Sequence, residues 1–464
     1  MKTNQLPVAI IGAGPIGLAA AAHLLKRGET PIVFEAGPSV GAAVLQWGHV
    51  RLFSPWRYLI DREAAALLEA DGWVAPDPEA YPTGRELVEG YLIPLAYHPR
   101  VQPHLHLNTR VVAVTRQGVD KMKTPGREKA PFVLRLQTTS GEEQDVLARA
   151  VIDASGTYET PNPLGAHGIP ARGERALREY IFYGIPDILG TQRERYAGRR
   201  VLVVGSGHSA FNALLELAAL AQEHPSTHLL WAIRRTELHQ LFGGRERDAL
   251  PARGELGQRM QALVESGQVR LVTGVHIHLL HQTGEGIVIA GEEERLGPVD
   301  EIIATTGFRP DLSLARELRL ALDTGLESPV ALAPLIDPNV HSCGTVPPHG
   351  VDELSHPEEH FYIVGMKSYG RAPTFLTLTG YEQVRSIVSA LTGDWEAARQ
   401  AELVLPETGV CSTDAGGSCA VPSTQEVTRQ DDLAEESASC CGTSPARQLL
   451  TVGASRSPAA SCCG

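Results

Sequence analysis

The sequence predicts an α/β protein with two parallel-sheet units, followed by a flexible tail. Three observations support this fold class. A chain of 464 residues is too long for one ordinary core and suggests about three domain-sized units. A strand, a glycine-rich turn, a helix and a second strand occur in this order twice, beginning at Val8 and Val201. From about Pro406, small polar and acidic residues replace almost all aromatic ones, which is typical of disorder.

Composition and charge narrow the classes of partner. Hydrophobic residues make up 43% of the chain and charged residues 20%, as in ordinary globular proteins. The net charge of −13 argues against nucleic acid or an anionic membrane surface as the main partner. The uncharged run from Val8 to Leu25 divides into a strand, a turn and an alanine-rich helix, so it is not read as a signal or a membrane span. We expect a cytoplasmic protein with a small-molecule substrate, and a homo-oligomer is left open.

The first unit contains strands at Val8–Ile11 and Pro31–Phe34, separated by a glycine turn and a helix at Leu18–Lys26. An acidic residue, Glu35, ends the second strand, 23 positions after the first turn glycine, Gly12. This order and spacing form the fingerprint of a dinucleotide-binding unit.

Each residue type in this fingerprint has a physical role. Gly12 permits the sharp turn, and Gly14 lets the backbone approach a pyrophosphate that faces the helix N-terminus. Gly17 allows the helix to pack closely on the strand, and Glu35 can accept hydrogen bonds from ribose hydroxyls. Together with Pro15, these residues form the first candidate cofactor site.

The next hundred residues are expected to combine helices, strands and one loop. Thr83 with Glu86 three residues later is a capping-box signature for a helix start. The expected helices are Asp61–Gly72 and Thr83 to about Ala96, and the expected strands are Val111–Thr115, Phe132–Thr138 and Ala150–Ala154.

The second unit repeats the pattern with two differences. Strands are expected at Val201–Val204 and His228–Ile233, with a helix at Phe211–Gln222 between them. Ala210 takes the place of the third turn glycine, and the second strand ends in two arginines instead of an acid. The candidate cofactor residues here are Gly205, Ser206, Gly207, Ser209, Arg234 and Arg235.

The two ribose ends predict two different nucleotides. An acid such as Glu35 would repel a 2′-phosphate, whereas Arg234 and Arg235 would bind one through charge-assisted, often bidentate, hydrogen bonds. The first site therefore suits a free ribose and the second suits NADPH. FAD together with NADPH is the economical pair of cofactors.

Two further motifs carry a resemblance to a known family. Asp153–Gly156 and Ala304–Asp311 are similar to the two strand-end motifs of flavoproteins with two dinucleotide-binding domains. That group includes flavin-containing monooxygenases, N-hydroxylases and pyridine nucleotide-disulfide reductases. The resemblance implies cofactor contacts at Ser155, Gly156, Thr306, Gly307 and Gly365.

The resemblance also implies the domain organisation. An FAD-binding domain would comprise residues 1–165 and 309–405, with an NADPH-binding domain at 178–305 inserted between them. Residues 406–464 would form the tail, and Gly380–Leu391 the closing helix of the first domain. In many relatives an aspartate follows the glycine equivalent to Gly365. Here Met366 and Lys367 stand there, and Lys367 either offsets charge on a flavin or reaches solvent.

The absence of early cysteines bears on the reaction. No cysteine precedes Cys343, so the redox pair that disulfide reductases carry near either nucleotide site is missing. The run Val50–Trp56 resembles the monooxygenase and N-hydroxylase branch. The fingerprint of Baeyer–Villiger enzymes is broken, because Ile188 stands where a histidine is expected. The favoured reading is oxygenation of a soft nucleophile (sulfur, nitrogen or trivalent arsenic), and reduction of a disulfide, quinone or thiophilic metal is the alternative.

The remaining cysteines suggest a further role. Cys343, in a proline-rich loop, is a candidate catalytic thiol, although the sequence favours a buried inert cysteine over it. The tail contains two adjacent pairs, which suit a thiophilic metal or metalloid because vicinal cysteines close a disulfide only with strain. These residues are Cys440, Cys441, Cys462 and Cys463. Mercuric reductases have a similar terminal pair, and some flavoproteins linked to arsenic resistance resemble this chain. A metal-binding or redox-sensing flavoprotein is thus a third reading.

Overall fold

The fold is described from a computed structural model. It describes residues 6–237, 241–242, 251–340, 346–373 and 375–403. The predicted flexible tail and Cys343 lie outside these ranges.

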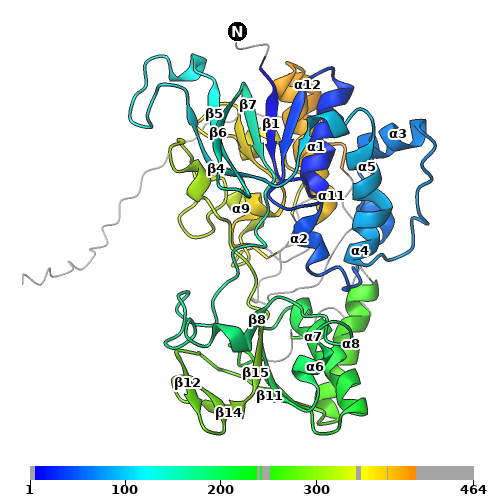
Figure 1. The fold of residues 1–464 in the computed structure, drawn as a ribbon, viewed down its shortest axis with the longest axis vertical. Helices are drawn as coiled ribbons and strands as arrows, with labels where there is room; N and C mark the ends of the chain where they lie inside the picture. The colour runs from blue at the N-terminus through cyan, green and yellow to red at the C-terminus, as the bar shows by residue number, and fades with distance from the viewer. Residues whose placement is uncertain (1–5, 238–240, 243–250, 341–345, 374, 404–464) are drawn as a thin grey trace, which may run out of the picture. The chain divides into compact units, whose positions relative to one another are not determined.

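The first sheet has five parallel strands in the order β16–β7–β1–β2–β3 (Figure 1). Helices α1 (Pro15–Lys26) and α11 (Thr377–Leu391) pack on one face, and an antiparallel three-stranded sheet packs on the other. The parallel strands are β1 (Val8–Ile11), β2 (Pro31–Phe34), β3 (Leu105–His106), β7 (Ala150–Asp153) and β16 (Phe361–Ile363), and the antiparallel ones are β4 (Thr109–Arg116), β5 (Phe132–Thr138) and β6 (Glu143–Ala148).

The second sheet repeats this arrangement, with five parallel strands in the order β11–β10–β9–β15–β8. Helices α7 (His208–Glu223) and α8 (Pro251–Glu265) contribute to the core on one side, and a second antiparallel sheet to the core on the other. The parallel strands are β8 (Ile181–Tyr183), β9 (Arg200–Val204), β10 (His228–Ala232), β11 (Val269–Val272) and β15 (Glu301–Ala304), and the antiparallel ones are β12 (Leu279–Thr283), β13 (Gly286–Ala290) and β14 (Arg295–Val299).

All strands of the second sheet lie, along the chain, between two neighbouring strands of the first. β7 and β16 pair directly, from Val151 with Phe361 to Asp153 with Ile363, although the whole second sheet separates them in sequence. The predicted fold class, a doubly wound α/β unit with a second one inserted, is confirmed.

The two helices that follow the glycine turns start earlier than predicted. α1 begins at Pro15 and not at Leu18, because Gly14 caps it in an extended conformation and proline suits the first helical position. α7 likewise begins at His208, three residues before the predicted start. Both helices therefore reach further into their glycine turns, which brings their N-termini closer to a bound phosphate.

The helix predicted at Thr83–Ala96 is interrupted. It consists of α4 (Gly84–Leu87), a π-helical turn at Val88–Leu92 and α5 (Ile93–Tyr97). Pro94 has no N–H to donate to the Gly90 carbonyl, and the indole nitrogen of Trp73 donates to that carbonyl instead, at 3.1 Å. The predicted capping box of Thr83 and Glu86 is present.

The helix predicted at Asp61–Gly72 is α3 (Arg62–Ala70). It is capped by Asp61, whose side chain accepts from the backbone N–H groups of Glu63 and Ala64. Within the described ranges, every helix is too short or too polar to cross a bilayer.

Candidate functional site

The first glycine turn combines two tight approaches with one open face. A Cβ on Gly12, whose φ is +98°, would stand 2.7 Å from the Ala154 carbonyl oxygen. A Cβ on Gly17 would stand 2.0 Å from the Gly12 carbonyl oxygen. Gly14 has nothing within 4 Å on its Cβ side, which leaves room for a ligand against the backbone. The turn therefore fits the pyrophosphate of a dinucleotide.

Glu35 is tied to this turn by its own carboxylate. Oε2 accepts from the Ala13 amide and Oε1 accepts from the Gly37 amide, both at 2.8 Å. A carboxylate has about four acceptor positions, so two remain for ribose hydroxyls. The turn and the acid are thus one rigid unit, which the sequence pattern did not reveal.

The second turn is built in the same way at the end of β9. A Cβ on Gly205, whose φ is +132°, would stand 2.4 Å from the Thr305 carbonyl oxygen, whereas Gly207 has nothing within 4 Å. Arg234 and Arg235 follow β10 and are exposed. In the described part of the chain, neither guanidinium has a carboxylate within ion-pair distance. Their positive charge is therefore available to an anionic ligand.

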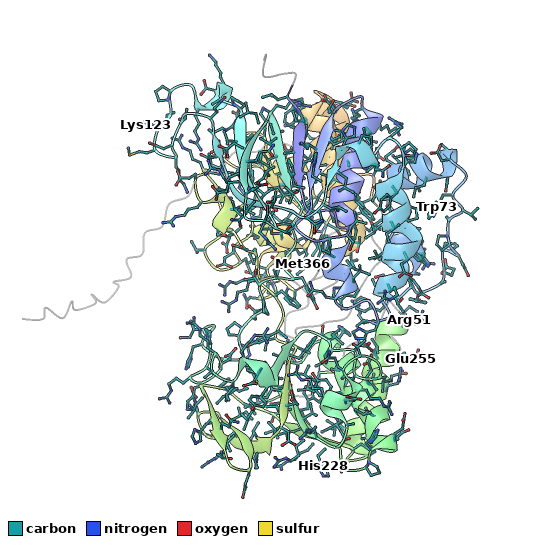
Figure 2. All side chains as sticks on the ribbon, in the orientation of Figure 1. Arg51, Trp73, Lys123, His228, Glu255 and Met366 are labelled. Atoms are coloured by element: carbon teal, nitrogen blue, oxygen red, sulfur yellow. The ribbon has the colours of Figure 1, made fainter. Side chains whose placement is uncertain are left out.

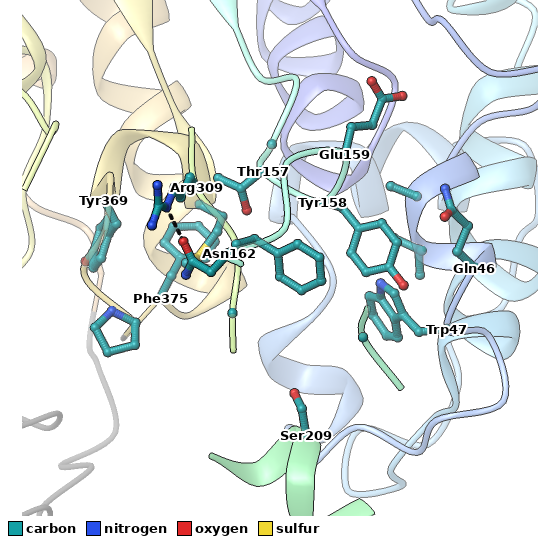
Figure 3. A pocket seen from close by; sticks show the side chains of 18 of the residues that line it. Gln46, Trp47, Thr157, Tyr158, Glu159, Asn162, Ser209, Arg309, Tyr369 and Phe375 are labelled. Atoms are coloured by element: carbon teal, nitrogen blue, oxygen red, sulfur yellow. Dashed lines mark hydrogen bonds between the residues drawn. The ribbon is translucent and has the colours of Figure 1, made fainter. Parts of the chain in front are cut away.

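Both turns open onto one cavity of about 1570 Å³ (Figure 3). Met366, labelled in Figure 2, lies in its wall. Gly17 is not in the wall, because it packs behind the turn against Gly12. The other candidate cofactor residues line the cavity: Gly12, Gly14, Pro15, Glu35, Ser155, Gly156, Gly205, Ser206, Gly207, Ser209, Arg234, Arg235, Thr306, Gly307 and Gly365.

Thr306 and Gly307 lie in the segment that follows β15. This segment is hydrogen-bonded to the segment around Asn162, which lies between β7 and β8. The Thr306 hydroxyl donates to the Asn162 carbonyl at 2.7 Å, and the Asn162 side-chain amide donates to the Thr306 carbonyl at 2.9 Å. Tyr158 and Phe308 stack with ring centroids 4.7 Å apart. Arg309 adds a hydrogen bond to the Asn162 side chain, drawn in Figure 3. The two segments are therefore held together at the wall of the cavity.

Lys367 does not reach solvent, which corrects one of the two expectations for it. Only 1% of its side chain is exposed, and its Nζ donates to Asp153 at 2.7 Å and to the Ser155 hydroxyl at 2.9 Å. The Ser155 hydroxyl and amide both donate to the other Asp153 oxygen. A buried ion pair thus fixes the Ser155–Gly156 bend beneath the cavity wall.

A second buried network holds Gly365. The Gly365 amide donates to the Gln383 side-chain oxygen at 2.7 Å, and the Gln383 nitrogen donates to the Ser368 hydroxyl at 2.9 Å. Ser368 in turn donates to the Gly365 carbonyl. The Gln383 nitrogen also lies 2.9 Å from His349 Nε2, and His349 Nδ1 lies 3.0 Å from the Pro347 carbonyl. The Pro347 carbonyl can only accept, so Nδ1 carries the proton, and the Gln383 N–H donates to Nε2. Burial lowers the pKa of His349, in agreement with this neutral ring.

The position expected to hold a histidine is part of the packed core. Ile188 is fully buried, and its amide donates to the carboxylate of Glu216 on α7 at 3.3 Å. Burial, opposed by this hydrogen bond and reinforced by Asp187, raises the pKa of Glu216 to about 7. Glu216 had not been singled out from the sequence, because an acid within an apolar helix gives no local signal of its burial.

The remaining candidates fall outside the described residues. Cys343 and the four tail cysteines, Cys440, Cys441, Cys462 and Cys463, all belong to this group. In the part of the chain that the structure describes, no three metal-ligating side chains gather at one point.

Comparison with known sequences gives consistent results. Residues 9–331 match the family model described as pyridine nucleotide-disulphide oxidoreductase. A ferredoxin–NADP reductase of Salinispora arenicola is 30% identical over 324 residues, which cover 69% of this chain and 79% of that protein. The flavin-containing monooxygenase FMO GS-OX-like 3 of Arabidopsis thaliana is 24% identical over 338 residues, covering 67% of this chain and 71% of that protein.

Comparison with solved structures supports the fold. A bacillithiol disulfide reductase from Bacillus cereus gives a TM-score of 0.61 at 20% identity, covering 84% of this chain and 99% of that chain. A cadaverine monooxygenase from Erwinia amylovora, solved with FAD, gives 0.60 at 13% identity, covering 88% and 99%. The predicted resemblance is confirmed, and the predicted cofactors, FAD and NADPH, agree with this family. The chain belongs to the pyridine nucleotide-disulphide oxidoreductase family, and it is a flavin- and pyridine-nucleotide-dependent oxidoreductase.

Proposed function

We propose that this protein is an NADPH-dependent flavin monooxygenase that oxygenates a small soft nucleophile: sulfur, nitrogen or trivalent arsenic. One observation carries the proposal. Two glycine turns open onto the same cavity, one with an acid and the other with two arginines at its ribose end. None of the described residues that line this cavity is a cysteine. A disulfide relay next to the flavin is therefore missing from the described wall, which argues against a disulfide reductase. The resemblance of Val50–Trp56 to the monooxygenase branch favours oxygen as the electron acceptor.

The chain's own residues would hold the cofactors as follows. Gly12 and Gly14 admit the pyrophosphate of FAD, and Glu35 accepts from its ribose. Arg234 and Arg235 bind the 2′-phosphate of NADPH. When bound, the flavin supplies the redox chemistry, and the protein orients the reactants and excludes water around it.

Relatives and sequence features support this reading. The Arabidopsis relative carries the name flavin-containing monooxygenase, and a structural neighbour acts on an amine, cadaverine. The vicinal cysteine pairs of the tail suit capture of a metalloid such as arsenic. A role in metal or metalloid resistance is part of the proposal for this reason, with the tail as a trap or a delivery arm.

A second candidate function is reduction without oxygenation. The ferredoxin–NADP reductase relative, at 30% identity, favours it. In that case the acceptor would be a disulfide, a quinone, a thiophilic metal or a small redox protein. The same nucleotide residues would serve, and oxygen would not be incorporated into any product.

The experiment that separates these functions is rapid mixing of the NADPH-reduced, FAD-loaded protein with oxygenated buffer. For a monooxygenase, we expect a new flavin absorption band that persists for seconds and decays faster when a substrate is added. Products from methyl sulfides, primary amines and arsenite would then be identified by mass. Immediate return of the oxidised flavin spectrum, with stoichiometric hydrogen peroxide under all conditions, would reject the monooxygenase and favour the reductase.

A further inference from the structure

One region of the cavity wall belongs to neither glycine turn. It comes from residues within 369–373 and 375–379, at the start of α11, together with Arg309. Tyr369 and Phe375 contact each other edge to face, with ring centroids 5.2 Å apart. Figure 3 shows both rings on the same side of the cavity as Arg309, away from Ser209 of the second turn. This region combines aromatic surface with positive charge.

Arg371 contributes a cation that is held in place. Its Nε and Nη2 donate to the two carboxylate oxygens of Glu327 at 2.8 and 3.0 Å. Its backbone amide donates to the Leu326 carbonyl at 2.7 Å. This bidentate pair fixes the guanidinium at the cavity wall and compensates one positive charge.

Arg309 contributes a cation without a compensating carboxylate. Its Nη2 donates to the Gly168 carbonyl at 2.9 Å and its Nε donates to the Asn162 side chain, and both acceptors are neutral. In the described part of the chain, no carboxylate lies within 4.0 Å of its guanidinium. Burial, and after it the charge of Arg371, lower the pKa of Arg309, and the charge of Glu327 opposes them. Both guanidinium side chains line the same cavity. Three of its five N–H donors remain free of these two bonds.

The charge balance of this region leaves one positive charge in excess. Arg309, Arg371 and Glu327 sum to +1, and the excess lies in the cavity wall, where Arg309 is half-buried and the Arg371 side chain is 41% exposed. The phosphates of the two nucleotides are already matched by the two turns and by Arg234 and Arg235. An arginine fork is suited to a carboxylate, and the neighbouring aromatic rings are suited to an apolar body.

We propose that Arg309 and Arg371 form a subsite for the carboxylate of an amphipathic organic acid, which is the substrate or part of it. This deepens the proposed function, on which it rests, by giving the substrate class a negative charge. The soft nucleophile would belong to the same molecule, with its apolar part against Tyr369 and Phe375. The subsite makes the cavity selective for anions over neutral molecules of equal shape.

The test uses two probes of equal shape and different charge, benzoate and benzamide. Each is titrated into the full-length, FAD-loaded protein, and binding is measured by calorimetry. We expect benzoate to bind at least tenfold more tightly than benzamide. Arg309→Met and Arg371→Met each bring the local charge to zero, and each should remove that preference. Glu327→Gln raises the local charge to +2 and should strengthen benzoate binding.

The matched control is Arg399→Met. Arg399 is exposed and makes the same kind of two-bond pair, with Asp352, away from the cavity. It should leave both affinities unchanged. Equal binding of the two probes, or a benzoate preference that survives Arg309→Met, would overturn the proposal. The reaction of the NADPH-reduced samples with oxygen, followed by the flavin spectrum without benzoate, tests the proposed function separately, because it does not depend on the carboxylate subsite.

Discussion

At the scale of single residues, the buried ion pair of Lys367 and Asp153 is expected to matter for the stability of the fold. Both side chains are 1% exposed, so each charge is compensated almost entirely by the other and by Ser155. Removing one partner of such a pair leaves an unpaired charge in the interior, which costs about 3–5 kcal/mol. We expect Lys367→Met to lower the free energy of unfolding of the FAD-loaded protein by roughly this amount, measured by urea denaturation.

The double variant Lys367→Met with Asp153→Asn is the control for that experiment. It removes both charges and should recover a large part of the lost stability. If the single variant were as stable as the parent, the pair would not be buried in solution as described.

The arginines at the end of β10 are expected to determine nucleotide choice. Both are exposed in the cavity wall, and in the described residues neither is neutralised by a carboxylate. Replacing Arg234 and Arg235 with alanine should raise the KM for NADPH at least tenfold and leave the KM for NADH nearly unchanged. Steady-state kinetics with both nucleotides gives the comparison, and an equal loss for both would exclude a specific 2′-phosphate contact.

Residues differed in how far the sequence alone could reveal their roles. The demands on Gly12, Gly14 and Glu35 are local, since they follow from a short turn and its spacing, and the geometry agrees with them. The partner of Lys367 lies 214 positions earlier in the chain, so no local pattern indicates the pair. The same is true of Arg309 and Asn162, which are 147 positions apart.

At the scale of elements, helix α7 contains an acid whose ionisation opposes folding. Glu216 has its pKa raised from 4.5 to about 7 by burial, so the folded state keeps a proton that the unfolded state loses. Its contribution to stability is fully present below about pH 4.5 and is lost as the pH rises through 7. Because the side chain is partly exposed, we expect this loss to be about 1–2 kcal/mol.

Glutamine at this position imitates the protonated acid. Glu216→Gln should match the parent near pH 4.5 and exceed its stability at pH 8, measured as the midpoint of urea unfolding across pH. Parallel pH profiles for the two proteins would show that Glu216 does not titrate in this range.

The interrupted helix between residues 84 and 97 shows why some elements are harder to predict. The capping box correctly indicated a helix start at Thr83. Pro94 predicts a break in the helix. The form of the break depends on Trp73, whose indole N–H donates to the Gly90 carbonyl that Pro94 leaves without a donor. Since Trp73 reaches that carbonyl only in the folded protein, the π-helical turn could not be placed from local sequence.

At the scale of the whole molecule, the two repeated glycine fingerprints predicted the two parallel sheets, and the family resemblance implied that one unit is inserted into the other. The strand order β16–β7–β1–β2–β3 required in addition that a late strand returns beside β7. The motif resemblance at Ala304–Asp311 indicated that return. The cavity that both turns share, and the pair Arg309 and Arg371 in its wall, depend on contacts between segments far apart in the sequence. Local sequence patterns therefore could not predict them.

The cysteine tail can be separated from the rest of the molecule by experiment. We expect replacement of Cys440, Cys441, Cys462 and Cys463 with serine to abolish tight binding of arsenite, measured by calorimetry, and to leave NADPH-dependent turnover of small acceptors unchanged. The parent chain supplies the reference for both measurements. A parallel loss of turnover would instead indicate that the tail delivers the substrate to the flavin.

The nesting of one sheet within the other has a consequence for biosynthesis. The first sheet needs β16, which leaves the ribosome more than 200 residues after β7, its neighbour. At about 5–20 residues per second this is a wait of roughly ten seconds or more. The inserted unit is contiguous and can fold during that interval, whereas the edge of β7 stays open to wrong pairing. We therefore expect ribosome-bound chains that end before Phe361 to resist protease across residues 178–305 and to be cut within residues 6–150, and uniform resistance would contradict this order of folding.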